Sequence, residues 1–237
     1  MDSSDLFEAN QASSQPSLIE DNIGMEPEYY NAAAKGEIGV FKGITEPLNQ
    51  LLTPNRNTVL HIHLTSLIEG SEASTAFVEE ILRIHPPLLW QANVKGETPL
   101  HVAARYGLAP IVEVLIERAK SQQEELESGV NKTVKEMLEM TNNEKDTAFH
   151  EAVRGNHLDI VKRLIQEGPD YSYSQNDAGE TPFYIAVERR FKEVMHHILL
   201  KCKSPAHVGP LGRTTLHAAV IWYDQGNAYL LSIGLFH

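Results

Sequence analysis

Thr-Pro-Leu-His-Val-Ala-Ala, at residues 98–104, is the stretch that decides the fold. Thr98 is a favourable helix N-cap, and Pro99 stands at the first helical position, where its missing N–H is harmless. The two alanines at the end of the stretch are small enough to let a neighbouring helix approach closely. Gly107 follows, and a glycine ends a helix well because it tolerates a positive φ. The stretch therefore predicts a short helix that packs closely against others of its kind.

The same pattern occurs five times along the 237-residue chain. The copies occupy residues 58–64, 98–104, 147–153, 181–187 and 214–220. Their first threonines are 40, 49, 34 and 33 residues apart. The last two spacings match the period of about 33 residues that is typical of ankyrin repeats. The two longer spacings require insertions, which we place near residues 69–76 and 120–135.

A second amphipathic segment follows each of the central copies, for example at residues 111–116 and 158–165. Gly96, Gly179 and Gly212 each precede the capping threonine by two residues, where a tight turn needs a glycine. We therefore predict an all-α fold. It is an ankyrin-repeat solenoid of stacked helix-turn-helix units with short β-hairpin fingers.

The repeat pattern also divides the chain into segments. Residues 1–27 are rich in Ser, Gln, Asp and Asn and are predicted to form a disordered arm. Residues 28–222 are predicted to form the ankyrin-repeat domain, with a degenerate N-terminal cap, about four full repeats and a partial final repeat. Residues 223–237 form a tail that does not match the pattern. Because the last unit lacks a recognisable outer helix, we expect fraying from about Pro205 onward.

Composition limits the classes of partner. The formal net charge is −12, which disfavours nucleic acid and an anionic bilayer surface. The only cysteine, Cys202, excludes an internal disulfide framework and fits a reducing compartment. We see no secretory signal and no apolar run of the roughly 18–20 residues that cross a bilayer. The sequence as written therefore predicts a cytoplasmic protein without a membrane span.

The histidines are the most obvious candidates for catalysis or metal binding. The four in the repeated pattern occur once per repeat, so they are spread along the stack and do not converge on one site. We expect each imidazole to bridge the capping threonine and nearby backbone; they are His61, His101, His150 and His217. Neither His61 with His63 nor His196 with His197 has the spacing for a two-point metal site on a helix. We expect no enzyme activity, no cofactor, no metal and no small-molecule substrate.

Binding is expected on the concave surface that stacked repeats form from their finger tips and inner helices. Side chains there that are not needed for packing are free to bind a protein partner. Tyr106, Arg105 and Arg154 are the favoured anchors, because Tyr and Arg are enriched at interface hot spots. The full set of candidates is Val94, Lys95, Glu97, Arg105, Tyr106, Asn143, Glu144, Asp146, Arg154, Asp177, Glu180, Glu188 and Arg189.

The chain resembles a particular family between about residues 28 and 221. The residues that carry this resemblance are 52–61, 96–105, 127–130, 156–162, 178–184 and 204–210. They resemble plant ankyrin-repeat membrane proteins of the accelerated-cell-death-six type. The resemblance implies a role in plant defence, salicylic-acid-linked signalling and control of cell death. It also implies an ankyrin array on the cytosolic side of the plasma membrane, followed by a block of membrane-spanning helices.

The sequence departs from that family after Ile221, where the repeat pattern stops and no membrane block follows. Two functions therefore remain open. One is a non-enzymatic scaffold or adaptor that binds proteins in defence signalling. The other is a truncated remnant of a multi-pass membrane protein, either non-functional or dominant-interfering.

Overall fold

The computed structural model describes residues 24–44, 47–67, 75–124, 134–168, 174–202 and 208–215. The predictions for most of the N-terminal arm, for His217 and for the C-terminal tail lie outside these ranges. Parts of both predicted insertions, residues 68–74 and 125–133, also lie outside them. Within the described ranges, no helix is both long and apolar enough to cross a membrane.

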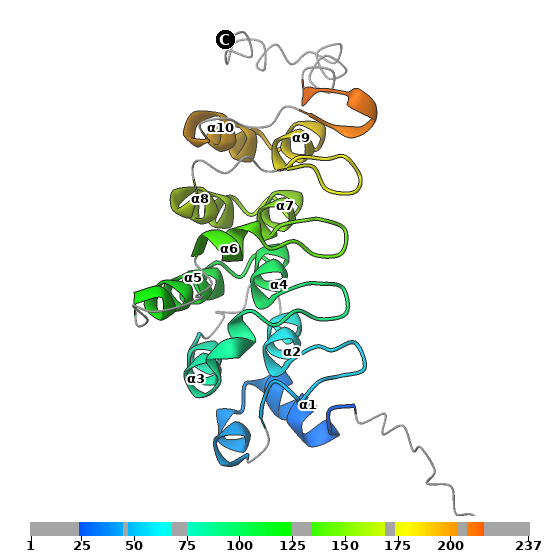
Figure 1. The fold of residues 1–237 in the computed structure, drawn as a ribbon. Coiled ribbons are helices and arrows are strands. Elements are labelled where there is room, and N and C mark those ends of the chain that lie inside the picture. Colours follow the sequence, from blue (N-terminus) through cyan, green and yellow to red (C-terminus); the bar gives the residue numbers. More distant parts are fainter. Residues whose placement is uncertain are drawn as a thin grey trace, which may run out of the picture.

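Helix pairs stack along one axis, which confirms the predicted solenoid (Figure 1). Each of the four central units has an inner helix followed by an outer helix. The N-terminal unit pairs α1 with a 3-10 helix, and a last 3-10 helix, Pro210–Gly212, lies at the other end. The pairs are α1 (Pro27–Lys35) with η1 (Ile38–Gly43), α2 (Val59–Ser66) with α3 (Ala76–Ile84), α4 (Pro99–Arg105) with α5 (Ala109–Glu124), α7 (Ala148–Arg154) with α8 (Leu158–Glu167), and α9 (Pro182–Glu188) with α10 (Lys192–Lys201).

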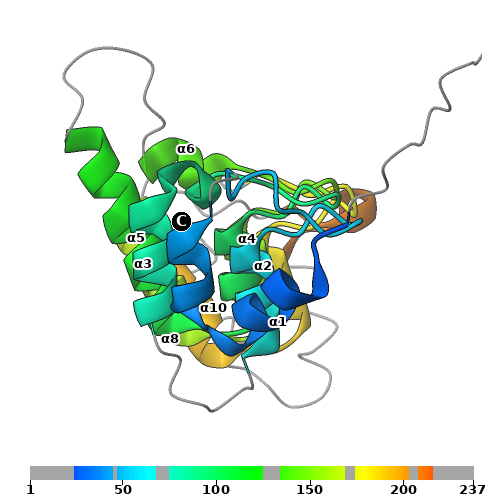
Figure 2. The ribbon, with the colours of Figure 1, turned by 90° about the horizontal axis from the view of Figure 1, so that it is seen from below.

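Seen along the stack, the inner helices lie between the outer helices and the finger loops (Figure 2). The inner helices stack closely because their facing residues are small: Ala103, Ala152 and Ala186 are fully buried. The outer helices contribute larger apolar side chains such as Leu115 and Ile160, which are also buried. The core is therefore continuous from one unit to the next, as the repeat pattern predicted.

One helix was not predicted from the sequence. Residues Val134–Glu139 form α6, which packs against α5 and α8. Its buried residues Val134, Met137 and Leu138 have the i, i+3, i+4 spacing of an amphipathic helix. The segment between the second and third repeats is thus partly structured. The preceding helix, α5, extends to Glu124 and is longer than the other outer helices.

The fingers are tighter than the predicted β-hairpins. In the described residues they are turns closed by a backbone hydrogen bond, such as Asn142 N–H to Asp146 O at 2.9 Å, and only isolated β-bridges accompany them. Neighbouring fingers are joined at their tips. Asn143 N–H donates to Lys95 O at 2.9 Å, and Asp177 N–H donates to Glu144 O at 2.9 Å. These bonds fix the spacing of the fingers along the stack.

A residue with positive φ stands two positions before the capping threonine in every described finger. The predicted glycines occupy this position in three fingers, with φ of 76° at Gly96, 78° at Gly179 and 71° at Gly212. The other two fingers place side-chain-bearing residues there, with φ of 56° at Arg56 and 61° at Lys145. A residue with a Cβ is strained in this region, so these two positions store backbone strain.

Replacing Arg56 with glycine removes that strain from the first finger. We expect Arg56→Gly to raise the free energy of unfolding by about 0.5–1 kcal/mol, since glycine adopts positive φ without a penalty but loses more entropy on folding. The reverse change is Gly96→Ala, whose Cβ would lie 2.9 Å from the Asn143 backbone nitrogen. We expect it to lower the free energy of unfolding by at least about 1 kcal/mol. Chemical denaturation measures both, and a less stable Arg56→Gly variant would contradict the argument.

Candidate partner-binding surface

The repeated histidines are part of the helix caps, as predicted. The Nδ1 of His61 lies 2.8 Å from Thr58 Oγ1 and accepts from the Thr58 backbone N–H. Because Nδ1 is an acceptor, the proton is on Nε2, which donates to the Glu97 carbonyl at 2.8 Å. His101 makes the same bonds to its own threonine, and its Nε2 donates to the Asp146 carbonyl at 3.1 Å. Each imidazole thus ties an inner helix to the finger of the following repeat.

The third and fourth repeats vary this arrangement. His150 bonds its capping Thr147, but its Nε2 lies near the Glu180 carbonyl without forming a hydrogen bond of ordinary geometry among the described residues. In the fourth repeat Tyr184 replaces the histidine and is buried. There the hydroxyl of Thr181 donates to the Val208 carbonyl at 3.1 Å. Among the described residues, no group of three His, Cys, Asp or Glu side chains is placed to hold a metal ion.

A groove of about 770 Å³ runs between the finger tips and the inner helices of the second, third and fourth repeats. We call it the repeat groove. It contains nine of the thirteen candidate binding residues together with four that the sequence did not suggest. Its lining residues are Val94, Lys95, Glu97, Arg105, Asn142, Asn143, Glu144, Glu151, Arg154, Asn176, Asp177, Ala178 and Glu180.

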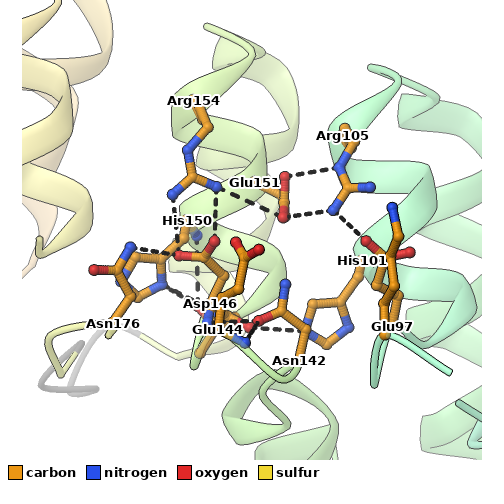
Figure 3. Close-up of polar contacts among 12 residues, drawn as sticks. Glu97, His101, Arg105, Asn142, Glu144, Asp146, His150, Glu151, Arg154 and Asn176 are labelled. Carbon is orange, nitrogen blue, oxygen red and sulfur yellow. Dashed lines mark hydrogen bonds and ion pairs between the residues drawn. The ribbon is translucent and has the colours of Figure 1, made fainter. Parts of the chain in front are cut away.

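Ion pairs form the floor of the groove (Figure 3). Glu151, on α7, accepts two hydrogen bonds from the Arg105 guanidinium, at 3.0 and 2.7 Å. Arg105 also contacts Glu97 at 2.5 Å. On the other side, Arg154 binds both carboxylate oxygens of Asp146, at 2.8 and 3.1 Å. A 3.6 Å contact from Arg154 to Glu151 closes a charge network that spans the second and third repeats.

The carboxylates of this network are buried, whereas the arginines are partly exposed. The side chains of Asp146, Glu151 and Glu97 are 1%, 4% and 7% exposed. Burial alone raises the pKa of Asp146, but hydrogen bonds from Arg154 and Asn176 outweigh it and hold this pKa below its ordinary value. Glu97 behaves in the same way, with Asn93 and Arg105 lowering its pKa against the effect of burial. Asp146 and Glu97 are therefore ionised and paired at neutral pH.

The assumption that these candidates are not needed for packing was wrong for four of them. Glu97 and Asp146 are buried, and Arg105 and Arg154 neutralise buried carboxylates. Glu151 was missed, although the sequence held a signal for it. It follows the histidine of its repeat, where the neighbouring inner helices carry an apolar residue such as Val102. A charge in that apolar register indicates a buried ionic partner.

The remaining candidates lie on the rim or beyond it. Tyr106 is 44% exposed and lines an adjoining hollow of about 290 Å³. This hollow shares Val94, Lys95, Glu97 and Arg105 with the repeat groove, and Val94 is 52% exposed. Glu188 and Arg189 are exposed and line neither hollow. Of the thirteen candidates, nine line the repeat groove, Tyr106 lines the adjoining hollow, and Asp146 is buried beneath the groove. Glu188 and Arg189 lie outside.

Two sequence models of known families match the chain. The ankyrin repeat matches residues 95–122, and the family of multiple ankyrin repeats matches residues 149–196. The matches overlap the helix pairs α4–α5, α7–α8 and α9–α10, whose caps and fingers were described above. Residues 95–122 and 149–196 therefore carry ankyrin repeats, and ankyrin repeats are protein-binding modules.

Among curated proteins, the chain is similar to Protein ACCELERATED CELL DEATH 6 of Arabidopsis thaliana. The two are 24% identical over 188 residues, which is 76% of this chain and 26% of that protein. It is also 23% identical to the nuclear factor NF-kappa-B p105 subunit of Gallus gallus, over 80% of this chain and 21% of that protein. Rabankyrin-5 of Mus musculus is 31% identical over 58% of this chain and 11% of its own length. The chain spans about a quarter or less of each of these relatives.

Arg105 is predicted to be needed for stability. Arg105→Ala leaves Glu97 as a buried carboxylate without its arginine and Glu151 with only the 3.6 Å contact from Arg154. Because a third of Arg105 is exposed, we expect a loss of about 2–3 kcal/mol in the free energy of unfolding, less than for a fully buried pair. Arg83→Ala is the control, since Arg83 pairs with Glu80 on the exposed surface and its loss should change little. Equal stability of the two variants in urea denaturation would contradict the buried network.

The cap histidines predict a pH dependence of stability. Burial lowers the pKa of His61, His101 and His150 below the ordinary value of about 6.5. Below that pH the unfolded chain binds more protons than the folded chain, so the free energy of unfolding falls as the pH is lowered from about 6.5 towards the folded-state values. Denaturation at about pH 7, 6 and 5 measures this decline. In His101→Gln the decline should be shallower; an identical slope would mean that His101 does not contribute.

Proposed function

We propose that this chain is a non-enzymatic adaptor that binds a protein partner in the repeat groove and the adjoining hollow. The observation that carries the proposal is the pairing of a rigid polar floor with exposed anchors. The floor is held by internal ion pairs, while Tyr106 and Val94 stand exposed beside it. An aromatic side chain next to a concave surface is typical of interface hot spots.

The rigidity of this surface supports binding. The finger tips are tied to one another by backbone hydrogen bonds, and the floor arginines are each held by two or more carboxylates. A partner would therefore meet a surface whose side chains are already ordered, which reduces the entropy lost on association. The side chains on the rim are not held by these pairs, so they can determine which partner binds.

Several side chains of the kinds that catalysis uses have structural roles in this chain. Both imidazole nitrogens of His61 and of His101 are used in caps and in bonds to the next finger. Cys202 is buried, and burial raises the pKa of its thiol to about 11, which keeps it protonated. These commitments favour a binding role over a catalytic one.

The biological setting that we propose is defence and cell-death signalling, with the array facing the cytosol. The support is the similarity to Protein ACCELERATED CELL DEATH 6 over most of this chain. In that setting the groove would recruit a signalling protein. Expression of the chain in Arabidopsis leaves, followed by measurement of lesion formation, tests the setting; lesions unchanged from those of untransformed leaves would argue against it.

A matched pair of tyrosines tests the groove. Tyr106 and Tyr30 are 44% and 46% exposed, but only Tyr106 lies beside the groove, whereas Tyr30 is on α1. We expect Tyr106→Ala to weaken partner binding by about tenfold or more, as for an interface hot spot, and Tyr30→Ala to leave it unchanged. Proteins captured from Arabidopsis leaf extract are identified first, and their affinities are then measured with the purified variants. Partners that bind both variants as tightly as the wild type would place the interface elsewhere.

A further inference from the structure

One finger of the repeat groove differs from its neighbours in how its asparagine is used. In each of three successive fingers, an asparagine stands five residues before the capping threonine. The Oδ1 atom of this asparagine accepts backbone N–H groups of its own finger. For Asn142 the donors are the N–H groups of Glu144 and Asp146, both at 2.9 Å. Asn93 and Asn176 accept equivalent bonds in the second and fourth repeats. The Oδ1 atoms thus hold the finger turns in shape.

The amide nitrogens of the outer two asparagines are also used. Asn93 Nδ2 donates to Glu97 Oε2 of its own finger at 3.0 Å, and Asn176 Nδ2 contacts Glu180 Oε2 of its own finger at 3.3 Å. The third finger has Asp146 where these fingers have glutamate. Aspartate is one methylene shorter, and its oxygens bind Arg154 and Asn176. Among the described residues, the Asn142 Nδ2 donates no hydrogen bond.

This free donor belongs to a residue that is only 8% exposed and lines the repeat groove. The Nδ2 atom is not among the buried side-chain atoms without a partner, so it faces the groove, where solvent or a ligand can supply an acceptor. Figure 3 shows Asn142 beside Glu144, below the Arg105–Glu151 pair in that view. The donor is therefore available to an acceptor atom bound in the groove, and a backbone carbonyl of an extended peptide is such an acceptor.

The charges around Asn142 select against an anionic acceptor. Five carboxylates and three cationic side chains line the groove. Both floor arginines are already bound by buried carboxylates, so an anion could take them only by leaving those carboxylates unpaired. The third cation, Lys95, lies close enough to the Glu97 carboxylate to help lower its pKa. Glu144, by contrast, is exposed and has no cationic partner among the described residues. A cationic side chain would gain this carboxylate without breaking any internal pair.

We propose that the repeat groove docks an extended peptide segment carrying a lysine or arginine, with a peptide carbonyl on Asn142 Nδ2 and the cation on the Glu144 carboxylate. This inference rests on the proposed function, because it specifies the partner of the same surface. The volume of about 770 Å³ lies within the range of sites that enclose part of a ligand.

Three synthetic pools of nine-residue peptides test the charge selectivity. They share uncharged random flanks and differ only at a central lysine, glutamate or norleucine. Fluorescence anisotropy with the full chain should show the lysine pool binding about fivefold more tightly than the norleucine pool, with the preference weakening at high salt. Glu144→Gln should abolish that preference and leave the norleucine pool unaffected. Equal binding of the lysine and glutamate pools would overturn the proposal.

A charge-conserving variant tests the donor. In Asp146→Glu the longer side chain can reach the Asn142 amide, as Glu97 and Glu180 do in their own fingers, so the affinity for both the lysine and norleucine pools should fall about fivefold. Glu188→Asp, outside the groove, is the matched control and should leave affinity unchanged. NMR of the wild-type chain adds an independent readout, because the side-chain NH₂ signals of Asn142 should shift on titration with the lysine pool. Unshifted signals at saturation would overturn the assigned role of Asn142.

The two proposals fail in different ways. If a captured partner depends on Tyr106 but docks through a segment without a basic residue, this inference is wrong and the adaptor function stands. If no partner depends on Tyr106, the adaptor function fails as stated. In that case, saturable binding of the lysine pool that Glu144→Gln weakens would still support the docking site.

Discussion

The bond from a cap histidine to the finger of the next repeat is the interaction on which the rest of the structure depends. In His61 and His101 the imidazole is buried, and its two nitrogens serve two repeats: one completes the cap of its own inner helix, and the other donates to a backbone carbonyl of the next finger. The carbonyls are those of Glu97 and Asp146, the residues that also carry the buried carboxylates of the groove. The residue before the capping threonine therefore fixes the repeat spacing through its carbonyl and places its carboxylate at the concave surface.

The charge network follows from that placement. Once Glu97 and Asp146 are held against the inner helices, their carboxylates are taken out of water and require cations. Arg105 and Arg154, at the ends of α4 and α7, supply them, and Glu151 joins the two arginines between repeats. The network therefore contributes more to a defined arrangement of the groove than to net stability, because desolvation of the carboxylates offsets much of the ionic attraction.

Local chemistry explains how much the sequence could predict. Caps, small-residue packing and positive-φ turns depend on neighbours within a few positions, so the inner helices and the glycine turns were predicted correctly. Arg105 and Glu151 are 46 positions apart in the sequence, with an insertion between them. A pattern within a few residues does not indicate that two such distant side chains face each other. For the same reason, exposed-looking polar residues of the fingers were taken as free when two of them are buried. The α6 helix was missed because it lies at the edge of a segment interpreted as an insertion, although its apolar spacing was readable.

The residues of the groove floor are held in buried ion pairs, whereas the residues of the rim are not. Substitutions at Arg105 or Asp146 would disturb a buried pair, so the floor is constrained by folding. Rim residues such as Glu144 carry no such constraint and are free to match a ligand. The Asn142 amide stands between these two cases. Its oxygen holds the finger turn, whereas its nitrogen lacks both the glutamate acceptor of its own finger and the acceptor in the preceding finger that Asn93 and Asn176 have. Because both acceptors are missing in one finger, a hydrogen-bond donor remains available on the surface of the groove.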